Sequence, residues 1–135
     1  MALDLERMMI LLQRRYNTIR DIHRLTEELA ESFSRNDQVS VSMLLQMRAD
    51  EIVKCEDCIL KIWELAGAGG EEAAQVRRLM VSDTSEGVSA GSQEEKKIFE
   101  IRKKTGEILE IIRRTDRMVS GRVGGEKSFY SKNKI

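Results

Sequence analysis

The chain has 135 residues, of which 34% are charged and 41% are apolar, with 23 basic and 23 acidic side chains. This length is enough for one domain. A net charge of zero argues against non-specific binding to nucleic acid or to an anionic membrane surface, because both need a surplus of cations. The sequence has no proline and is rich in helix-forming residues, which predicts long charged helices with narrow apolar seams.

The first predicted helix covers about residues 2–33. Its apolar residues recur at steps of three and four, which is typical of the seam of a coiled-coil-like helix: Leu5, Met8, Leu12, Tyr16, Ile19, Ile22, Leu25, Leu29 and Phe33. The polar stretch 34–38 interrupts this pattern, and its Ser, Asn and Asp residues favour turns. Asp37 is a candidate N-cap for the helix that follows.

The second predicted helix covers about residues 38–66. Its apolar seam consists of Val41, Leu45, Ile52, Cys55, Ile59, Ile62 and Ala66. Arg48 falls on the same seam, so its guanidinium must either reach solvent or find a carboxylate. Glycines at 67, 69 and 70 end the helix.

The linker 67–91 separates the second helix from the third. Within it, residues 71–81 can form a short extra helix, whereas 82–91 read as a polar loop. Ser92 and Glu95 have the spacing of a capping box, in which the serine bonds the backbone of Glu95 and the glutamate reaches back. The third helix follows over about 92–119, with a seam of Ile98, Ile101, Thr105, Ile108, Ile112, Thr115 and Val119.

The expected fold is all-α. The short break between the first two helices predicts an antiparallel hairpin, and the third helix is long enough to lie along it. We therefore expect an elongated, coiled-coil-like antiparallel three-helix bundle formed by residues 1–120 as a single domain. Residues 121–135 are rich in glycine and lysine, carry Phe129 and Tyr130, and are expected to form a flexible basic tail that docks.

The sequence lacks a catalytic constellation, so we expect no enzymatic activity, no cofactor and no metal. Cys55 and Cys58 form a CxxC motif, but it lies inside a predicted helix rather than at the N-terminus, where a thiol is activated. A zinc ion needs four ligands, and only His23 could add a third. A phosphotransfer role for His23 lacks the lysine and glycine that usually accompany it, so all three residues are interpreted as structural.

Basic doublets occur four times but do not indicate a nucleic-acid site. Each has acidic residues nearby, as expected for i,i+4 pairs on solvated helix faces: Arg14-Arg15, Arg77-Arg78, Lys96-Lys97 and Arg113-Arg114. The sequence also lacks a signal peptide pattern and any apolar run of about 20 residues that could span a membrane. We expect a cytoplasmic protein with reduced cysteines.

Two groups of apolar residues exceed what the seams need. Met43 and Met47 lie one turn apart on the side of the second helix away from its seam. Leu109, Ile111 and Met118 widen the apolar arc of the third helix to about half its circumference. This arc is either buried between the other two helices or left for a partner helix, with methionine as an adaptable contact.

The layout resembles the FlgN/FliT type of flagellar export chaperone. The resemblance rests on the long first helix, the break at Asn36-Asp37, and a second helix with a leucine pair followed by an arginine, here Leu44, Leu45 and Arg48. A third amphipathic helix and a polar tail with an aromatic pair fit the same layout. The glycine-rich stretch 67–91 has no counterpart in it.

The resemblance implies a cytoplasmic protein that binds an amphipathic helix of a hook-associated or filament-cap protein, prevents premature assembly, and delivers it to the export apparatus. The implied binding surface consists of Ile108, Leu109, Ile111, Ile112, Met118, Val119, Phe129 and Tyr130. The alternative is a structural coiled-coil protein that forms homodimers or larger homo-oligomers through the same arc.

Overall fold

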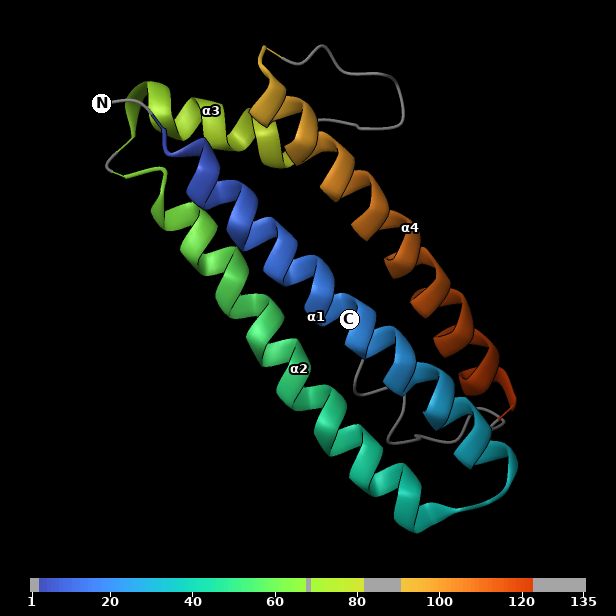
Figure 1. Ribbon diagram of the computed structural model, residues 1–135. Helices are drawn as coiled ribbons and strands as arrows, with labels where there is room; N and C mark the ends of the chain where they lie inside the picture. The colour runs from blue at the N-terminus through green and yellow to red at the C-terminus, as the bar shows by residue number, and fades with distance from the viewer. Residues whose placement is uncertain (1–2, 68, 82–90, 123–135) are drawn as a thin grey trace. The chain divides into compact units, whose positions relative to one another are not determined.

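The computed structural model describes residues 3–67, 69–81 and 91–122. These residues form four helices and no strand: α1 (Leu5–Ser34), α2 (Gln38–Glu64), α3 (Gly70–Val81) and α4 (Gln93–Arg122) (Figure 1). The expected all-α class is confirmed, and α3 is the short extra helix of the linker. α2 ends two residues earlier than predicted, and α4 continues three residues further.

The start of α1 lies later than predicted because Asp4 caps it. The Asp4 carboxylate accepts a hydrogen bond of 2.9 Å from the backbone N–H of Arg7, and its carbonyl accepts one of 3.0 Å from Met8. A side-chain acceptor at this position satisfies an N–H that has no partner within the helix. The helix therefore begins at Leu5 rather than at residue 2.

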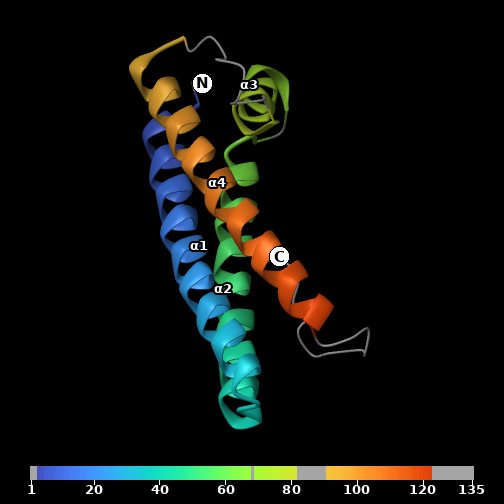
Figure 2. The ribbon, with the colours of Figure 1, turned by 90° about the vertical axis from the view of Figure 1, so that its right-hand side faces the viewer.

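The contacts divide the chain into two compact units. Among the described residues, unit 1 consists of 3–17, 55–67, 69–81 and 91–106, and unit 2 of 18–54 and 107–122. α1, α2 and α4 are continuous helices (Figure 2). Each of them contributes one segment to unit 1 and one segment to unit 2. In both units the α1 segment packs with segments of α2 and α4, and α3 belongs to unit 1 alone.

The core of unit 1 joins four helices. Its buried side chains are Leu3, Met8, Leu11, Leu12, Ile62, Val76, Leu79, Ile98 and Phe99. α3 contributes Val76 and Leu79, three residues apart and therefore on one face. Arg102 of α4 donates a hydrogen bond of 2.8 Å to the carbonyl of Leu79, which is one of the last carbonyls of α3.

The core of unit 2 contains residues from α1, α2 and α4. It consists of Leu25, Leu29, Val41, Leu44, Leu45 and Val119, with Ala30 and Phe33 packed against it. Leu44 and Leu45, the leucine pair noted in the sequence, are both buried here. The apolar seams predicted for these segments thus meet inside unit 2.

The turn between α1 and α2 is a Schellman motif. Asn36 adopts a left-handed conformation with φ of 56°, which asparagine tolerates better than most residues. Its N–H donates to the carbonyl of Phe33 (3.1 Å), and the N–H of Asp37 donates to the carbonyl of Ser32 (3.0 Å). Both bonds satisfy carbonyls at the end of α1.

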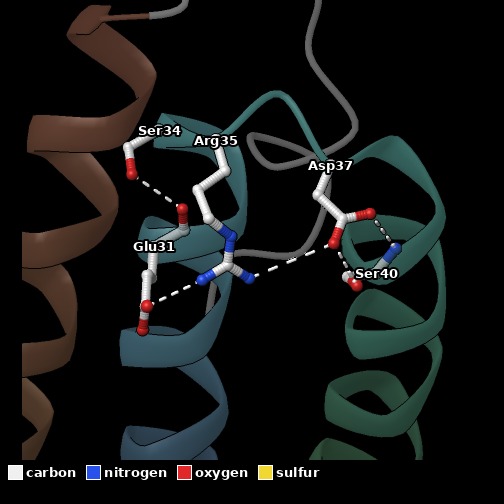
Figure 3. Close-up of polar contacts among 5 residues, drawn as sticks. All are labelled: Glu31, Ser34, Arg35, Asp37 and Ser40. Atoms are coloured by element: carbon white, nitrogen blue, oxygen red, sulfur yellow. Dashed lines mark hydrogen bonds and ion pairs between the residues drawn. The ribbon is translucent and has the colours of Figure 1, made fainter.

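Asp37 caps the start of α2, as predicted. Its carboxylate accepts hydrogen bonds from the backbone N–H of Ser40 (3.1 Å) and from the Ser40 hydroxyl (2.6 Å) (Figure 3). The hydroxyl bond is the main reason why the pKa of Asp37 lies below its ordinary value. Arg35 lies between Glu31 (2.7 Å) and Asp37 (4.0 Å).

Ser92 and Glu95 form the start of α4. The backbone N–H of Glu95 donates to the Ser92 hydroxyl (3.2 Å), as the capping box predicts. The Glu95 carboxylate reaches back to the N–H of Gly91 (3.0 Å), and also binds Arg78 (2.7 Å) and Gln75 (3.3 Å) of α3. The Arg78 hydrogen bond is the main cause that lowers the pKa of Glu95.

Glu95→Gln should lower the melting temperature at pH 7, because the neutral amide cannot replace the charge that faces Arg78. A carboxyl with a lowered pKa in the folded state contributes stability above its unfolded pKa, about 4.3, and loses it as the pH falls through the folded value. The difference between variant and wild type should therefore shrink from pH 5 to pH 2. Thermal melts followed by circular dichroism measure this. Glu94→Gln, an exposed neighbour, is the control, and a difference independent of pH would contradict the assignment.

Candidate partner-binding site

The apolar arc of α4 within unit 2 is divided between core and surface. Ile112 and Val119 are 0% and 2% exposed, whereas Ile111 and Met118 are 42% and 49% exposed. Ile108 and Leu109 are half-buried. The arc is therefore buried at Ile112 and Val119, and among its described residues only Ile111 and Met118 are exposed.

Two of the predicted binding residues belong to the predicted tail 121–135. The structure describes only Gly121 and Arg122 of the predicted tail 121–135, and both belong to α4. Phe129 and Tyr130 lie outside the described residues. The candidate site on the described residues therefore consists of the Ile111/Met118 stripe, the name used below for these two side chains.

A buried ion pair joins α4 to α2 inside unit 2. The Arg48 guanidinium is 0% exposed and donates two hydrogen bonds to the Asp116 carboxylate, at 2.9 and 3.0 Å. Thr26 of α1 accepts a third from Arg48 at 3.1 Å, while its own hydroxyl donates to the carbonyl of Ile22 at 2.7 Å. Of the two alternatives expected for Arg48, reaching solvent or finding a carboxylate, this bidentate arrangement is the second.

The sequence pattern did not indicate this role for Asp116. Its position next to the doublet Arg113-Arg114 places it among the acidic residues that neutralise a solvated face. The signal that identifies it is its spacing, since Asp116 lies four residues after Ile112 and three before Val119. An acid on the seam of α4 and an arginine on the seam of α2 are the natural pair.

Asp116→Ala should destabilise the protein by about 3–5 kcal/mol, because it leaves the Arg48 charge buried without a counter-charge. Glu110→Ala is the matched control on the same helix. Glu110 pairs with Arg114 and Arg117 at 3.5 Å in an exposed setting, where removal should cost about 1 kcal/mol or less. Chemical denaturation measures both. Equal losses for the two variants would contradict the buried role of the ion pair.

α2 also exposes apolar side chains in unit 2. Met43 and Met47 are exposed, as predicted from their position away from the seam, and so are Val39 and Val53. These residues lie on the side of α2 opposite to Val41 and Leu45. They form a second group of exposed apolar side chains besides the Ile111/Met118 stripe.

Cys55 and Cys58 are buried free thiols. Burial raises the pKa of Cys55, which opposes thiolate formation despite the nearby Arg15. Among the residues that the structure describes, no group of three or more His, Cys, Asp or Glu side chains is arranged to hold a metal ion. His23 pairs with Glu27 at 3.1 Å on an exposed helix face.

Both thiols should react slowly with a water-soluble aromatic disulfide reagent in the native protein, since each is buried and Cys55 resists ionisation. In denaturant both should react at the rate of an exposed thiol. Absorbance of the released thiolate follows the reaction. Rapid modification of one thiol in the folded protein would contradict the structural interpretation of these cysteines and would instead indicate a redox role.

The basic doublets are paired in two different ways. Arg114 pairs with Glu110 at i,i+4, as predicted for a solvated face. Arg78 instead pairs with Glu95 of another helix, which the sequence pattern did not indicate. In both arrangements the arginine forms an ion pair with a carboxylate of the same chain.

A shallow hollow lies beside the turn between α1 and α2, lined by Arg35, Ser40, Met43 and neighbouring residues. Arg35 bonds to Glu31 and Ser40 to Asp37. These polar groups are engaged with each other rather than directed together at one point. The hollow therefore lacks the converging polar groups of a small-molecule site.

Comparisons of the chain with models of protein families, with curated proteins and with solved structures found no match. In the parts of the chain that the structure describes, none of the helices combines the length and the apolar character needed to cross a membrane. The candidate site therefore has to be interpreted from its own residues.

Proposed function

We propose that the protein is a non-enzymatic chaperone that binds an amphipathic helix of a partner protein through the Ile111/Met118 stripe. The observation that supports this is the exposure of two large apolar side chains seven residues apart on α4. Seven residues are close to two helical turns, so both side chains lie on one face, about 10 Å apart. This spacing suits the i and i+7 positions of a bound helix.

Met43 and Met47 of α2 support the same type of activity. Their exposed thioether side chains are flexible and polarisable, and such side chains adapt to partner helices of different sequence. We propose that they are a second contact region.

The resemblance to the FlgN/FliT type extends the proposal to a biological role. In this proposal the protein is cytoplasmic and its long helices form an elongated antiparallel bundle. It binds a hook-associated or filament-cap protein, covers the apolar helix that would assemble too early, and delivers its partner to the flagellar export apparatus. Burial of apolar surface contributes roughly 25 cal/mol per Å², offset by the entropy of association.

The alternative is a structural protein that homo-oligomerises through the same stripe. Arg114 lies beside the stripe, three residues after Ile111 and four before Met118, and its 70% exposed side chain pairs with Glu110 at 3.5 Å. A two-fold axis through the stripe would bring the Arg114–Glu110 pairs of two copies together, and these opposite charges could pair across the interface.

The variant Ile111→Asp/Met118→Asp should keep its helix content and lose partner binding, because both side chains are exposed in the absence of a partner. Ile10→Asp is the matched control, since Ile10 of α1 is also 42% exposed. Affinity capture from the source cell with each protein tests this. We expect the wild type and the control, but not the double variant, to retain a hook-associated or filament-cap protein.

Failure to recover any flagellar protein from a flagellated source would contradict the proposed role. Mass measurement in solution separates the alternative from it. A stable wild-type dimer that dissociates in Ile111→Asp/Met118→Asp would identify the stripe as a contact between copies of the chain.

A further inference from the structure

In unit 2, α4 carries two apolar rows, and the structure buries the less apolar one. The inward row contains Leu109, Ile112, Asp116 and Val119, of which the last three are buried. The outward row contains Ile108, Ile111, Thr115 and Met118, of which Ile111 and Met118 are exposed and the other two are half-buried. The inward row includes a carboxylate, whereas the outward row contains no charged residue.

The two rows are related by a simple rotation of the helix. Each member of the outward row precedes a member of the inward row by one residue. One residue corresponds to about 100° around an α-helix. Turning the unit 2 segment of α4 by this angle would bury Ile111 and Met118 and carry Ile112, Asp116 and Val119 towards solvent. The apolar side chains of this segment alone therefore do not select the observed orientation.

The ion pair distinguishes between the two orientations of α4 within unit 2. With the inward row buried, Asp116 accepts two hydrogen bonds from Arg48, whose side chain is fully buried and also contacts Thr26. With the outward row buried, Thr115 would stand where Asp116 now lies, and the Arg48 guanidinium would lose its carboxylate. A buried charge without a partner is strongly unfavourable, whereas a matched apolar replacement of both partners is tolerated.

We propose that the Arg48–Asp116 ion pair selects which apolar row of α4 is buried and thereby holds the Ile111/Met118 stripe at the surface. Arg48 and Asp116 are positioning residues in this proposal. Their value lies in the specificity of packing rather than in net stability, a role that buried polar groups have in other helical proteins. The proposal concerns packing within unit 2 and does not depend on the identity of any partner.

Arg48→Leu/Asp116→Thr tests this directly, because it removes both charges and leaves each row with three apolar residues and one threonine. The probe is the rate at which dilute hydrogen peroxide oxidises each methionine of the full chain, followed by mass spectrometry of peptides. In the wild type, Met118 and Met43 are exposed and should oxidise rapidly, whereas the buried Met8 should be protected. In the double variant, Met118 should become several-fold slower while Met43 keeps its rate and the helix content is unchanged.

Glu110→Leu/Arg114→Leu, which removes an exposed pair from the same helix, should leave the Met118 rate as in the wild type. The charge-exchanged variant Arg48→Asp/Asp116→Arg restores an ion pair between the same positions and should keep Met118 rapid. It also tests the proposal if Arg48→Leu/Asp116→Thr does not fold. An unchanged Met118 rate in folded Arg48→Leu/Asp116→Thr, or a slow rate in a folded charge-exchanged variant, would overturn the proposal.

Discussion

A guanidinium group removed from water needs a carboxylate within hydrogen-bond distance, because desolvation of an unpaired charge costs more than the burial of one apolar side chain returns. Arg48 lies on the seam of α2 and imposes this requirement on unit 2. Asp116 meets it with two hydrogen bonds and Thr26 adds a third. Segments of α1, α2 and α4 are thus joined at one point, and the packing of Ile112 and Val119 has to be compatible with it.

The consequence of this requirement is visible on the surface of α4. Ile111 and Met118 are left exposed although a rotated helix could bury them. An exposed apolar stripe is a liability for solubility unless it has a use. The proposed roles of the ion pair and of the stripe are therefore connected. The buried ion pair holds the stripe outward, and the stripe is available to a partner helix.

The sequence allowed much of the local structure to be predicted. Apolar spacing located the long helices, polar residues located the turn at Asn36 and Asp37, and Met43 and Met47 were correctly placed on the outer side of α2. It also indicated that Arg48 must either reach solvent or find a carboxylate. These features depend on interactions within one helix or turn, or on periodicity, and both can be read from neighbouring residues.

Pairing between distant segments could not be predicted in the same way. Asp116 follows two arginines in the sequence, so local charge balance concealed its partner 68 residues away. Arg78 and Glu95 lie on different helices, and no local pattern indicates that they bind each other. The difference between Ile111 and Ile112 depends on the rotation of α4, and a broad apolar arc permits more than one rotation. The division into two units could not be predicted from the sequence either, because the apolar seams continue from one unit into the other without interruption.

The neighbouring residues Ile111 and Ile112 provide the most direct test of the orientation of α4. In a protein with isotopically labelled isoleucine methyl groups, a soluble paramagnetic agent broadens the NMR signals of methyl groups that it can approach. If the ion pair holds the stripe outward, the Ile111 signal should broaden strongly and the Ile112 signal should change little. Equal protection of both signals, or stronger broadening of Ile112, would show that α4 is oriented differently and would contradict the role of Arg48 and Asp116.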